Sequence, residues 1–154
     1  MIKFSVSRLD KEIIELTGTE PPEFLELTEN DYELTSNVLY DLKVEKVSGG
    51  VLVTGSCEVN IAGICGRCLV PVEAVVFNDE ISLFYETYES SGDEIDISED
   101  IRCELLLEFP MNLLCDDDCP GLCPKCGVNL NEEQCKCKGP SGSLAWSALD
   151  DLKL

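Results

Sequence analysis

The residues of this chain whose type and spacing indicate chemistry are its cysteines, and six of the ten lie between residues 115 and 137. A C-P-x-C-G turn forms the centre of that stretch. Pro124 and Gly127 suit the turn, because proline presets φ and glycine permits a left-handed conformation. Such a turn can direct two thiolates to one metal ion, and a second close pair completes the tetrahedral sulfur set of structural zinc. The sequence therefore predicts a zinc site, with disulfides or free thiols as the alternative, at Cys123, Cys126, Cys135 and Cys137.

Four further cysteines form two close pairs that are far apart in the sequence: Cys65 with Cys68, and Cys115 with Cys119. The first pair lies in a second CxxC turn between two expected strands, and the second pair follows an expected helix. If that helix packs on the strands, the two pairs meet and form a second zinc site, which joins the C-terminal module to the sheet. In the rival assignment, Cys115 or Cys119 serves the first site, and the CxxC cysteines stay reduced thiols.

The last two cysteines, Cys57 and Cys103, are predicted to pack in the core. Cys57 falls on the apolar face of an expected strand, and Cys103 lies in a leucine-rich helix. Free cysteine is among the most buried residue types, which favours this interpretation for both. A redox function of the CxxC at 65–68 is disfavoured, because redox CxxC motifs usually begin a helix of a βαβ unit.

The size and composition of the chain fit one ordinary domain with a small appended module. It has 154 residues, of which 44% are hydrophobic, so a packed core is expected. The first 16 residues carry charges throughout and contain no apolar segment of the kind found in secretory signals. No apolar run reaches the roughly 18 residues that a membrane span requires. We therefore expect a cytoplasmic protein without membrane contact, in a reducing compartment that favours metal sites over disulfides.

Charge and histidine content exclude several classes of function. Eleven basic and 31 acidic residues give a formal net charge of −20. Such a field repels nucleic acid and attracts basic proteins, so DNA is not an expected partner. The chain has no histidine, and it shows no glycine-rich phosphate loop and no nucleophile–base pair. The sequence therefore predicts a protein that is not an enzyme.

The elements that must position the cysteines are mainly strands. Alternation of apolar and polar residues predicts strands at 2–9, 38–44, 51–61, 69–77 and from residue 81 onward. The second and third of these flank Ser48-Gly49-Gly50, which is a good hairpin signal. Residues 18–30 are expected to form a loop or short helix, and the acidic residues 86–96 an exposed loop.

A helix is expected from Ser98, whose hydroxyl would cap it, to the residue before Pro110, which would end it. The predicted organisation is an antiparallel β domain at 1–110, a cysteine-rich zinc module at 111–138, and a linker with a short C-terminal helix at 139–154. The fold class is α+β, with a mainly antiparallel β-sheet or a barrel-like domain and a few helices.

Two stretches together resemble the YceD family, which was long catalogued as a domain of unknown function. The first is the CGRCL motif from Cys65 to Leu69, followed by Pro71. The second is LLLEFPM, residues 105–111, which leads into CDDDCPGLCPKCGVNLN, residues 115–131. The resemblance covers about residues 35–152.

The resemblance implies a protein needed for accumulation of 23S ribosomal RNA in a bacterium or an organelle. It also implies metal binding, and a structural role suits the metal, because some members of the family lack much of the cysteine module. The leading hypothesis is a non-enzymatic ribosome biogenesis factor that binds a basic ribosomal protein of the large subunit, precursor 23S rRNA, or both. The alternative is a zinc-dependent adaptor or a redox-sensing cysteine module.

Direct contact with RNA, if it occurs, is predicted at the cations near the zinc module: Arg67, Lys125, Lys136 and Lys138. For Arg67, charge compensation of the neighbouring thiolates is the favoured alternative. The acidic turn at 116–118 is expected to be solvated, because three adjacent side chains do not converge on one hard cation. Trp146 is expected to anchor the terminal helix.

Overall fold

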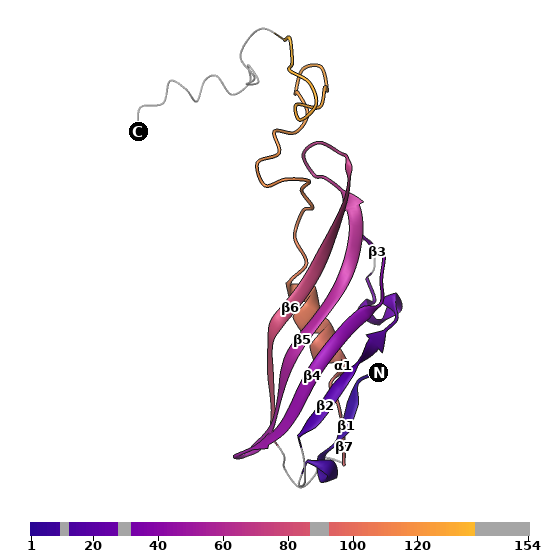
Figure 1. The fold of residues 1–154 in the computed structure, drawn as a ribbon, viewed down its shortest axis with the longest axis vertical. Helices are drawn as coiled ribbons and strands as arrows, with labels where there is room; N and C mark the ends of the chain where they lie inside the picture. Colours follow the sequence, from indigo (N-terminus) through magenta and orange to yellow (C-terminus); the bar gives the residue numbers. More distant parts are fainter. Residues whose placement is uncertain (10–12, 28–31, 87–92, 138–154) are drawn as a thin grey trace, which may run out of the picture.

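The computed structural model describes residues 1–9, 13–27, 32–86 and 93–137 (Figure 1). Seven strands are assigned in them: β1 Lys3–Ser5, β2 Ile14–Glu20, β3 Tyr32–Leu34, β4 Val38–Val47, β5 Gly50–Ile64, β6 Pro71–Glu86 and β7 Glu94–Asp96. The helical elements of the same residues are two short 3₁₀ helices, η1 Val6–Arg8 and η2 Pro22–Leu25, and the α-helix α1 Ser98–Leu107. No helix in these ranges is long and apolar enough to cross a membrane.

The main sheet is antiparallel and is built around the long strand β5. One edge of β5 pairs with β6 along its whole length, and the other pairs first with β4 and then with β3. Strand β2 extends the sheet beyond β4, and β1 and β7 form a separate two-stranded sheet. The predicted α+β fold with a mainly antiparallel sheet is confirmed. The sheet is open rather than barrel-like. Strands β5 and β6 continue beyond β4 as an arm that reaches the cysteine-rich segment (Figure 1).

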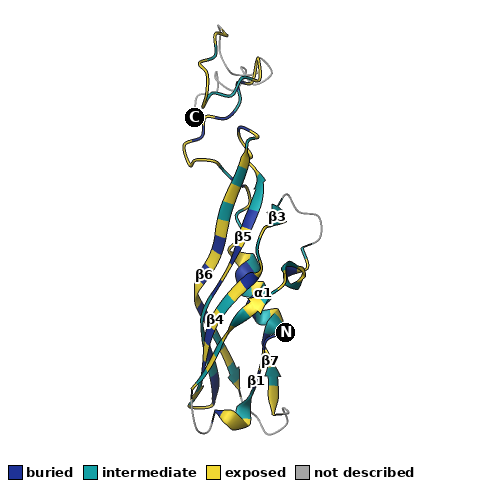
Figure 2. Ribbon diagram, turned by 45° about the vertical axis from the view of Figure 1, so that its right-hand side comes forward, coloured by how far each residue is buried: buried dark blue, intermediate teal, exposed yellow. Residues whose placement is uncertain are grey.

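The core lies on one face of this sheet. Side chains at odd positions of β5, among them Val53, Val59 and Ile61, are buried, and Ile101 and Leu105 of α1 pack against that face. Strand alternation exposes the intervening residues, as the changing colours along β6 show (Figure 2). Strands β4 and β5 pair antiparallel as far as Val47 opposite Gly50, so the predicted hairpin is confirmed.

Strand β6 was predicted as two strands separated at residues 78–80, and this was wrong. The register with β5 shifts by one residue, from Gly55 opposite Ile81 to Cys57 opposite Asn78. Before this bulge the even positions of β6 face the core, and after it the odd positions do, as the burial of Val76 and Ile81 shows. In the sequence, this switch in the alternation of buried and exposed residues resembles a break between two strands, although β6 stays paired with β5 on both sides of the bulge. Asn78 is the one buried polar side chain recorded in the described residues, and its amide donates to the carbonyl oxygen of Glu104 in α1 at 3.4 Å.

Helix α1 lies where it was expected, but the predicted capping role of Ser98 was wrong. Ile97 is the N-cap residue, and the Ser98 hydroxyl accepts a hydrogen bond from the backbone N–H of Ile2 at 2.7 Å. The backbone N–H of Ser98 donates to the Asp96 carboxylate at 3.0 Å instead. Ser98 thus joins the N-terminus of the chain to the start of α1.

The N-terminal predictions are confirmed only in part. The strand expected at 2–9 is shorter, because β1 gives way to η1 at Val6. Residues 18–30 were predicted as a loop or short helix, and they do contain η2, but β2 runs as far as Glu20. Of the expected acidic loop at 86–96, Glu94–Asp96 form β7 and residues 87–92 lie outside the described residues. The terminal helix with Trp146 lies outside them too, and the domain boundaries stay a prediction.

Candidate metal centres

Eight cysteines form two groups, each with four Sγ atoms that all lie within 4.8 Å of one another. We call Cys65, Cys68, Cys115 and Cys119 the hairpin cluster, and Cys123, Cys126, Cys135 and Cys137 the terminal cluster. The first contains cysteines 54 residues apart, since Cys65 Sγ lies 3.9 Å from Cys119 Sγ. These are the two sets that the sequence predicted, and the rival grouping of Cys115 or Cys119 with the terminal pairs is not the one that the geometry favours.

The hairpin cluster lies where the tip of the β5–β6 arm meets the segment after α1. Cys65, Cys68 and Cys119 are buried, whereas Cys115 is exposed. The Sγ atoms of Cys68 and Cys115 are 3.5 Å apart. The segment after α1 is held to the tip by the backbone N–H of Gly66, which donates to the Leu113 carbonyl oxygen at 2.8 Å.

The terminal cluster is formed within one short stretch and is more open. Cys123 is buried, Cys135 is half-buried, and Cys126 and Cys137 are exposed. The Sγ atom of Cys135 lies 3.2 Å from that of Cys123 and 3.6 Å from that of Cys126. Three of its four cysteines are thus not buried, whereas the hairpin cluster has only one such cysteine.

The two CxxC turns have the same backbone design. In the first, the N–H of Leu69 donates to the carbonyl oxygen of Cys65 at 3.0 Å, and in the second Gly127 does the same to Cys123 at 2.8 Å. The N–H of residue i+2 approaches the first sulfur in both, from Arg67 at 3.5 Å and from Lys125 at 3.4 Å. Both turns therefore present two sulfur atoms on one side of a backbone loop.

The residue after each turn has a left-handed conformation, with φ of +73° at Gly127 and +62° at Leu69. The prediction for Gly127 is confirmed. Leu69 shows that the first turn adopts the same geometry without glycine, which costs free energy for a residue with a Cβ atom.

Both donor sets fit zinc. Zn–S bonds of about 2.3 Å in a tetrahedron place sulfur atoms about 3.8 Å apart, and the closest pairs within the two clusters span 3.2 to 3.9 Å. A disulfide needs about 2.05 Å, and all ten cysteines are free. Four thiolates without a carboxylate or imidazole ligand suit a soft, closed structural site. Metal binding itself stays a prediction.

Hydrogen bonds to sulfur set the order in which the thiols ionise. Backbone N–H groups lower the pKa of Cys65 and of Cys123 to about 6. The bond from Asn131 lowers the pKa of Cys119. The pKa of Cys115 is raised to about 12, because its thiol donates to the sulfur atoms of Cys68 and Cys119. The backbone N–H of Cys137 lowers the pKa of Cys135, but the bonds that its thiol donates to neighbouring sulfur atoms outweigh this and raise that pKa to about 12. Each cluster thus combines at least one thiolate at neutral pH with thiols that hold their protons until a metal displaces them.

The clusters are linked to each other through the segment between Cys119 and Asn131. The Asn131 amide donates to Cys119 Sγ at 3.3 Å, and the N–H of Leu130 donates to the carbonyl oxygen of Gly121 at 2.9 Å. Gly121 has φ of +74°, and an added Cβ would lie 3.0 Å from the Arg67 carbonyl oxygen. The loop that carries the terminal cluster is therefore held by contacts to residues beside the hairpin cluster.

The predicted RNA-binding cations differ in their surroundings. Arg67 Nη1 donates to the carbonyl oxygens of Asp117 at 2.9 Å and of Cys119 at 3.0 Å, so this side chain links the CxxC turn to the loop that carries Cys115 and Cys119. Lys125 and Lys136 are exposed. Lys138 lies outside the described residues. Contact of these four with RNA stays a prediction. The turn at 116–118 is exposed, as predicted.

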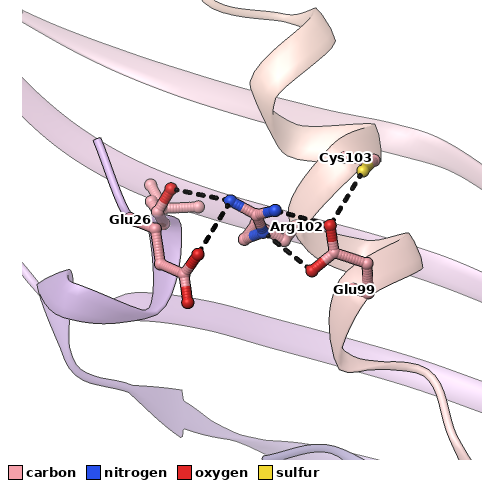
Figure 3. A network of polar contacts seen from close by, with 5 residues as sticks. Glu26, Glu99, Arg102 and Cys103 are labelled. Carbon is pink, nitrogen blue, oxygen red and sulfur yellow. Dashed lines mark hydrogen bonds and ion pairs between the residues drawn. The ribbon is translucent and has the colours of Figure 1, made fainter. Parts of the chain in front are cut away.

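Of the two cysteines assigned to the core, Cys57 is buried and Cys103 is not. Burial raises the pKa of Cys57 to about 11, and the carboxylates of Glu104 and Glu108 add to the effect. Cys103 lies on the exposed side of α1, and its thiol donates to Glu99 at 3.7 Å (Figure 3). The same carboxylate binds Arg102, which also contacts Glu26 (Figure 3). The helical period could have shown this exposure, because Cys103 is two residues from each of the buried Ile101 and Leu105, about 200° around the helix.

Comparison with known proteins identifies a relationship for the C-terminal half. Residues 85–153 match the sequence model of the family described as Large ribosomal RNA subunit accumulation protein YceD. A chloroplastic protein of Arabidopsis thaliana, named Large ribosomal RNA subunit accumulation protein YCED homolog 1, is 40% identical over 60 residues, which are 39% of this chain and 19% of that protein. A maize homologue of the same name is 42% identical over 52 residues, 33% of this chain and 18% of its own length.

An uncharacterised protein of Mycobacterium tuberculosis is 42% identical over 106 residues, which are 60% of this chain and 51% of that protein. The chain thus spans about half the length of the mycobacterial relatives that it matches. No solved structure gives a significant match. The resemblance to the YceD family is therefore confirmed, and the family match includes α1 and six of the eight clustered cysteines.

Proposed function

We propose, from the YceD region that this chain carries over residues 85–153, that the protein is a non-enzymatic factor in biogenesis of the large ribosomal subunit. It supports accumulation of 23S rRNA by binding a basic ribosomal protein, precursor rRNA, or both. The observation that carries the proposal is the family match, together with plant relatives whose names describe the same role.

The charge of the chain favours a ribosomal protein as the direct partner. A net charge of −20 repels RNA, whereas ribosomal proteins are basic because they bind RNA. In this mechanism the acidic surface shields a basic protein until it is transferred to the rRNA. If RNA is bound as well, the expected contacts are Arg67, Lys125, Lys136 and Lys138.

Zinc has a structural role in this proposal. The hairpin cluster would hold one ion and the terminal cluster a second, through the cysteines named above. The first ion closes a loop of about 50 residues between Cys68 and Cys115, and so holds the segment after α1 to the tip of the arm. The terminal cluster is then supported by Asn131 and Gly121 against the first.

The thiols of the clusters favour a second candidate, a redox-sensing module. Cys115, Cys126 and Cys137 are exposed, and the first cysteine of each CxxC turn has a lowered pKa. Thiol titration separates the two functions. Structural zinc sites react slowly until a chelator is added, whereas a sensor oxidises rapidly and reversibly with release of zinc.

The proposed function is tested by affinity capture of the tagged protein from native lysate, divided and washed with or without RNase. We expect basic proteins of the large subunit to remain bound after RNase treatment. If RNase treatment removes all ribosomal proteins and leaves only protected 23S rRNA fragments, the direct partner is RNA and not a ribosomal protein. Absence of both would refute the function.

A further inference from the structure

The outer face of the sheet, opposite α1, carries a groove of about 590 Å³. Thr19, Leu39, Glu58 and Phe77 are consecutive cross-strand neighbours on β2, β4, β5 and β6, and they form one row along this groove. Their sequence neighbours Val38, Cys57 and Val76 are buried on the core side. The row therefore faces away from α1.

The floor of this Phe77 groove is apolar and open. Phe77 is 57% exposed and Leu39 is 42% exposed, although residues of these types are usually buried. The groove lies beside the bulge of the main sheet, where Gly55 has φ of +149° and an added Cβ would meet the Asp41 carbonyl oxygen at 2.1 Å. Bulges bend a sheet and often accompany binding sites. The groove therefore adjoins a fixed irregularity of the sheet.

The walls of the groove are acidic. Asp41, Glu58 and Asp79 line it, and no lysine or arginine of the described residues does. A second hollow on the α1 side of β6 shares Phe77 and Asp79 and adds three more carboxylates: Glu80, Glu104 and Glu108. An exposed phenylalanine therefore stands between two acidic hollows. The buried thiol of Cys57, whose pKa is raised by burial and then by Glu104 and Glu108, reports the same negative potential from inside.

We propose that the Phe77 groove binds an extended, lysine- or arginine-rich segment of a partner protein that carries an apolar side chain. The apolar side chain contacts Leu39 and Phe77, and the cations lie against Asp41, Glu58 and Asp79. Charge complementarity selects this occupant, because phosphates and a second copy of this chain, at −20, would both be repelled. The proposal deepens the proposed function and rests on it only for the statement that the partner is a ribosomal protein.

The test uses the full zinc-loaded chain and a fluorescein-labelled, lysine-rich peptide with a central phenylalanine, followed by fluorescence anisotropy. We expect binding that weakens as salt rises. Phe77→Ser should weaken it about fivefold or more, as truncation of an interface anchor does. The triple variant Asp41→Asn, Glu58→Gln, Asp79→Asn should weaken it at least as much and reduce its salt dependence.

Matched controls separate the groove from general charge and hydrophobicity. Phe84→Ser removes another exposed phenylalanine of β6 that lies outside the groove, and Glu15→Gln, Glu23→Gln, Glu94→Gln removes three exposed charges elsewhere. Both should bind the peptide within about twofold of the wild type. The peptide with alanine in place of phenylalanine should bind as weakly to the wild type as the original peptide does to Phe77→Ser.

Three outcomes would overturn the proposal: no binding of the peptide, equal binding by the groove variants and the controls, or equal binding of the alanine peptide. A labelled single-stranded RNA that bound the wild type and not Phe77→Ser would assign the groove to RNA instead. Far-UV circular dichroism and zinc content confirm that each variant is folded. If lysate capture yields ribosomal proteins equally with wild type and groove variants, the groove is refuted and the proposed function stands. If the peptide results hold but lysate capture yields neither ribosomal proteins nor rRNA, the groove stands and the proposed function is refuted.

Discussion

The side-chain amide of Asn131 donates a hydrogen bond to the sulfur of Cys119 at 3.3 Å. Asn131 lies in the loop of the terminal cluster, and Cys119 belongs to the hairpin cluster, so one bond joins the two candidate metal centres. The bond also lowers the pKa of Cys119, because it stabilises the thiolate that a metal requires.

Replacement of Asn131 by alanine should therefore weaken metal binding at the hairpin cluster. Loss of such an outer-shell hydrogen bond typically costs about tenfold or more in metal affinity. We expect one of two zinc ions to be released about tenfold faster to a chromogenic chelator, with the other little changed. Asn112→Ala, an exposed asparagine beside the same cluster, is the control and should release both ions at wild-type rates. Identical kinetics for the two variants would contradict a role of Asn131.

Cys65→Ser combined with Cys68→Ser should lower the zinc content from two ions per chain to one. The hairpin cluster loses half its ligands, whereas the terminal cluster keeps all four. Elemental analysis of the purified variant measures the ratio, and limited proteolysis should show faster cleavage after α1, because the segment is no longer held to the arm. Cys103→Ser should keep two ions. A ratio that stays at two in the double variant would rule out the hairpin site.

The left-handed residues after the two CxxC turns should differ in how strongly substitution affects stability. Gly127→Val forces a β-branched side chain into φ of +73°, which should destabilise the terminal cluster by about 1–3 kcal/mol. Leu69→Gly relieves a similar strain at φ of +62°, and this gain is offset by the greater chain entropy of glycine in the unfolded state. We expect a change within about 1 kcal/mol for Leu69→Gly. Thermal unfolding of the zinc-loaded proteins checks both, and equal losses would show that the turns do not share one design.

Cys57 and Cys103 should differ sharply towards a thiol reagent at pH 7 in the zinc-loaded protein. The thiolate reacts, and with a pKa of about 11 the buried Cys57 is almost wholly protonated at this pH, whereas Cys103 is exposed. We expect one rapidly reacting thiol per chain in a colorimetric assay. Cys103→Ser should remove it and Cys57→Ala should not. Rapid reaction of two thiols in the wild type would contradict the burial of Cys57.

Zinc binding should release protons and strengthen as pH rises. Cys115 and Cys135 have pKa values raised to about 12, and those of Cys68 and Cys137 are raised as well, so these thiols are protonated in the metal-free protein at neutral pH. A ligand must lose its proton to bind, so at least two protons should leave per zinc ion, and affinity should fall as pH falls. Calorimetry in buffers of different ionisation enthalpy counts these protons. Binding without proton release would mean that the clusters are already ionised.

The cysteine turns show how far local patterns lead. The sequence alone was enough to predict both CxxC turns and the terminal cluster, because a C-P-x-C-G turn and a pair 9 residues beyond it need only the local backbone to converge. It also determined the hairpin of β4 and β5 and the net charge, which depend on alternation, turn residues and composition.

Which distant groups meet depends on how the folded elements pack. Cys65 and Cys119 come together because α1 packs on β5 and β6, and the chain after it then runs along the arm to the tip. The continuity of β6 depends on a bulge whose register is set by β5. The role of Ser98 depends on the approach of Ile2. The exposure of Cys103 depends on which side of α1 faces the sheet. The Phe77 groove depends on four strands and one bulge together. Local sequence specifies turns and faces, but contacts between segments 50 or more residues apart arise from the packing of whole elements, and that packing is a property of the complete chain.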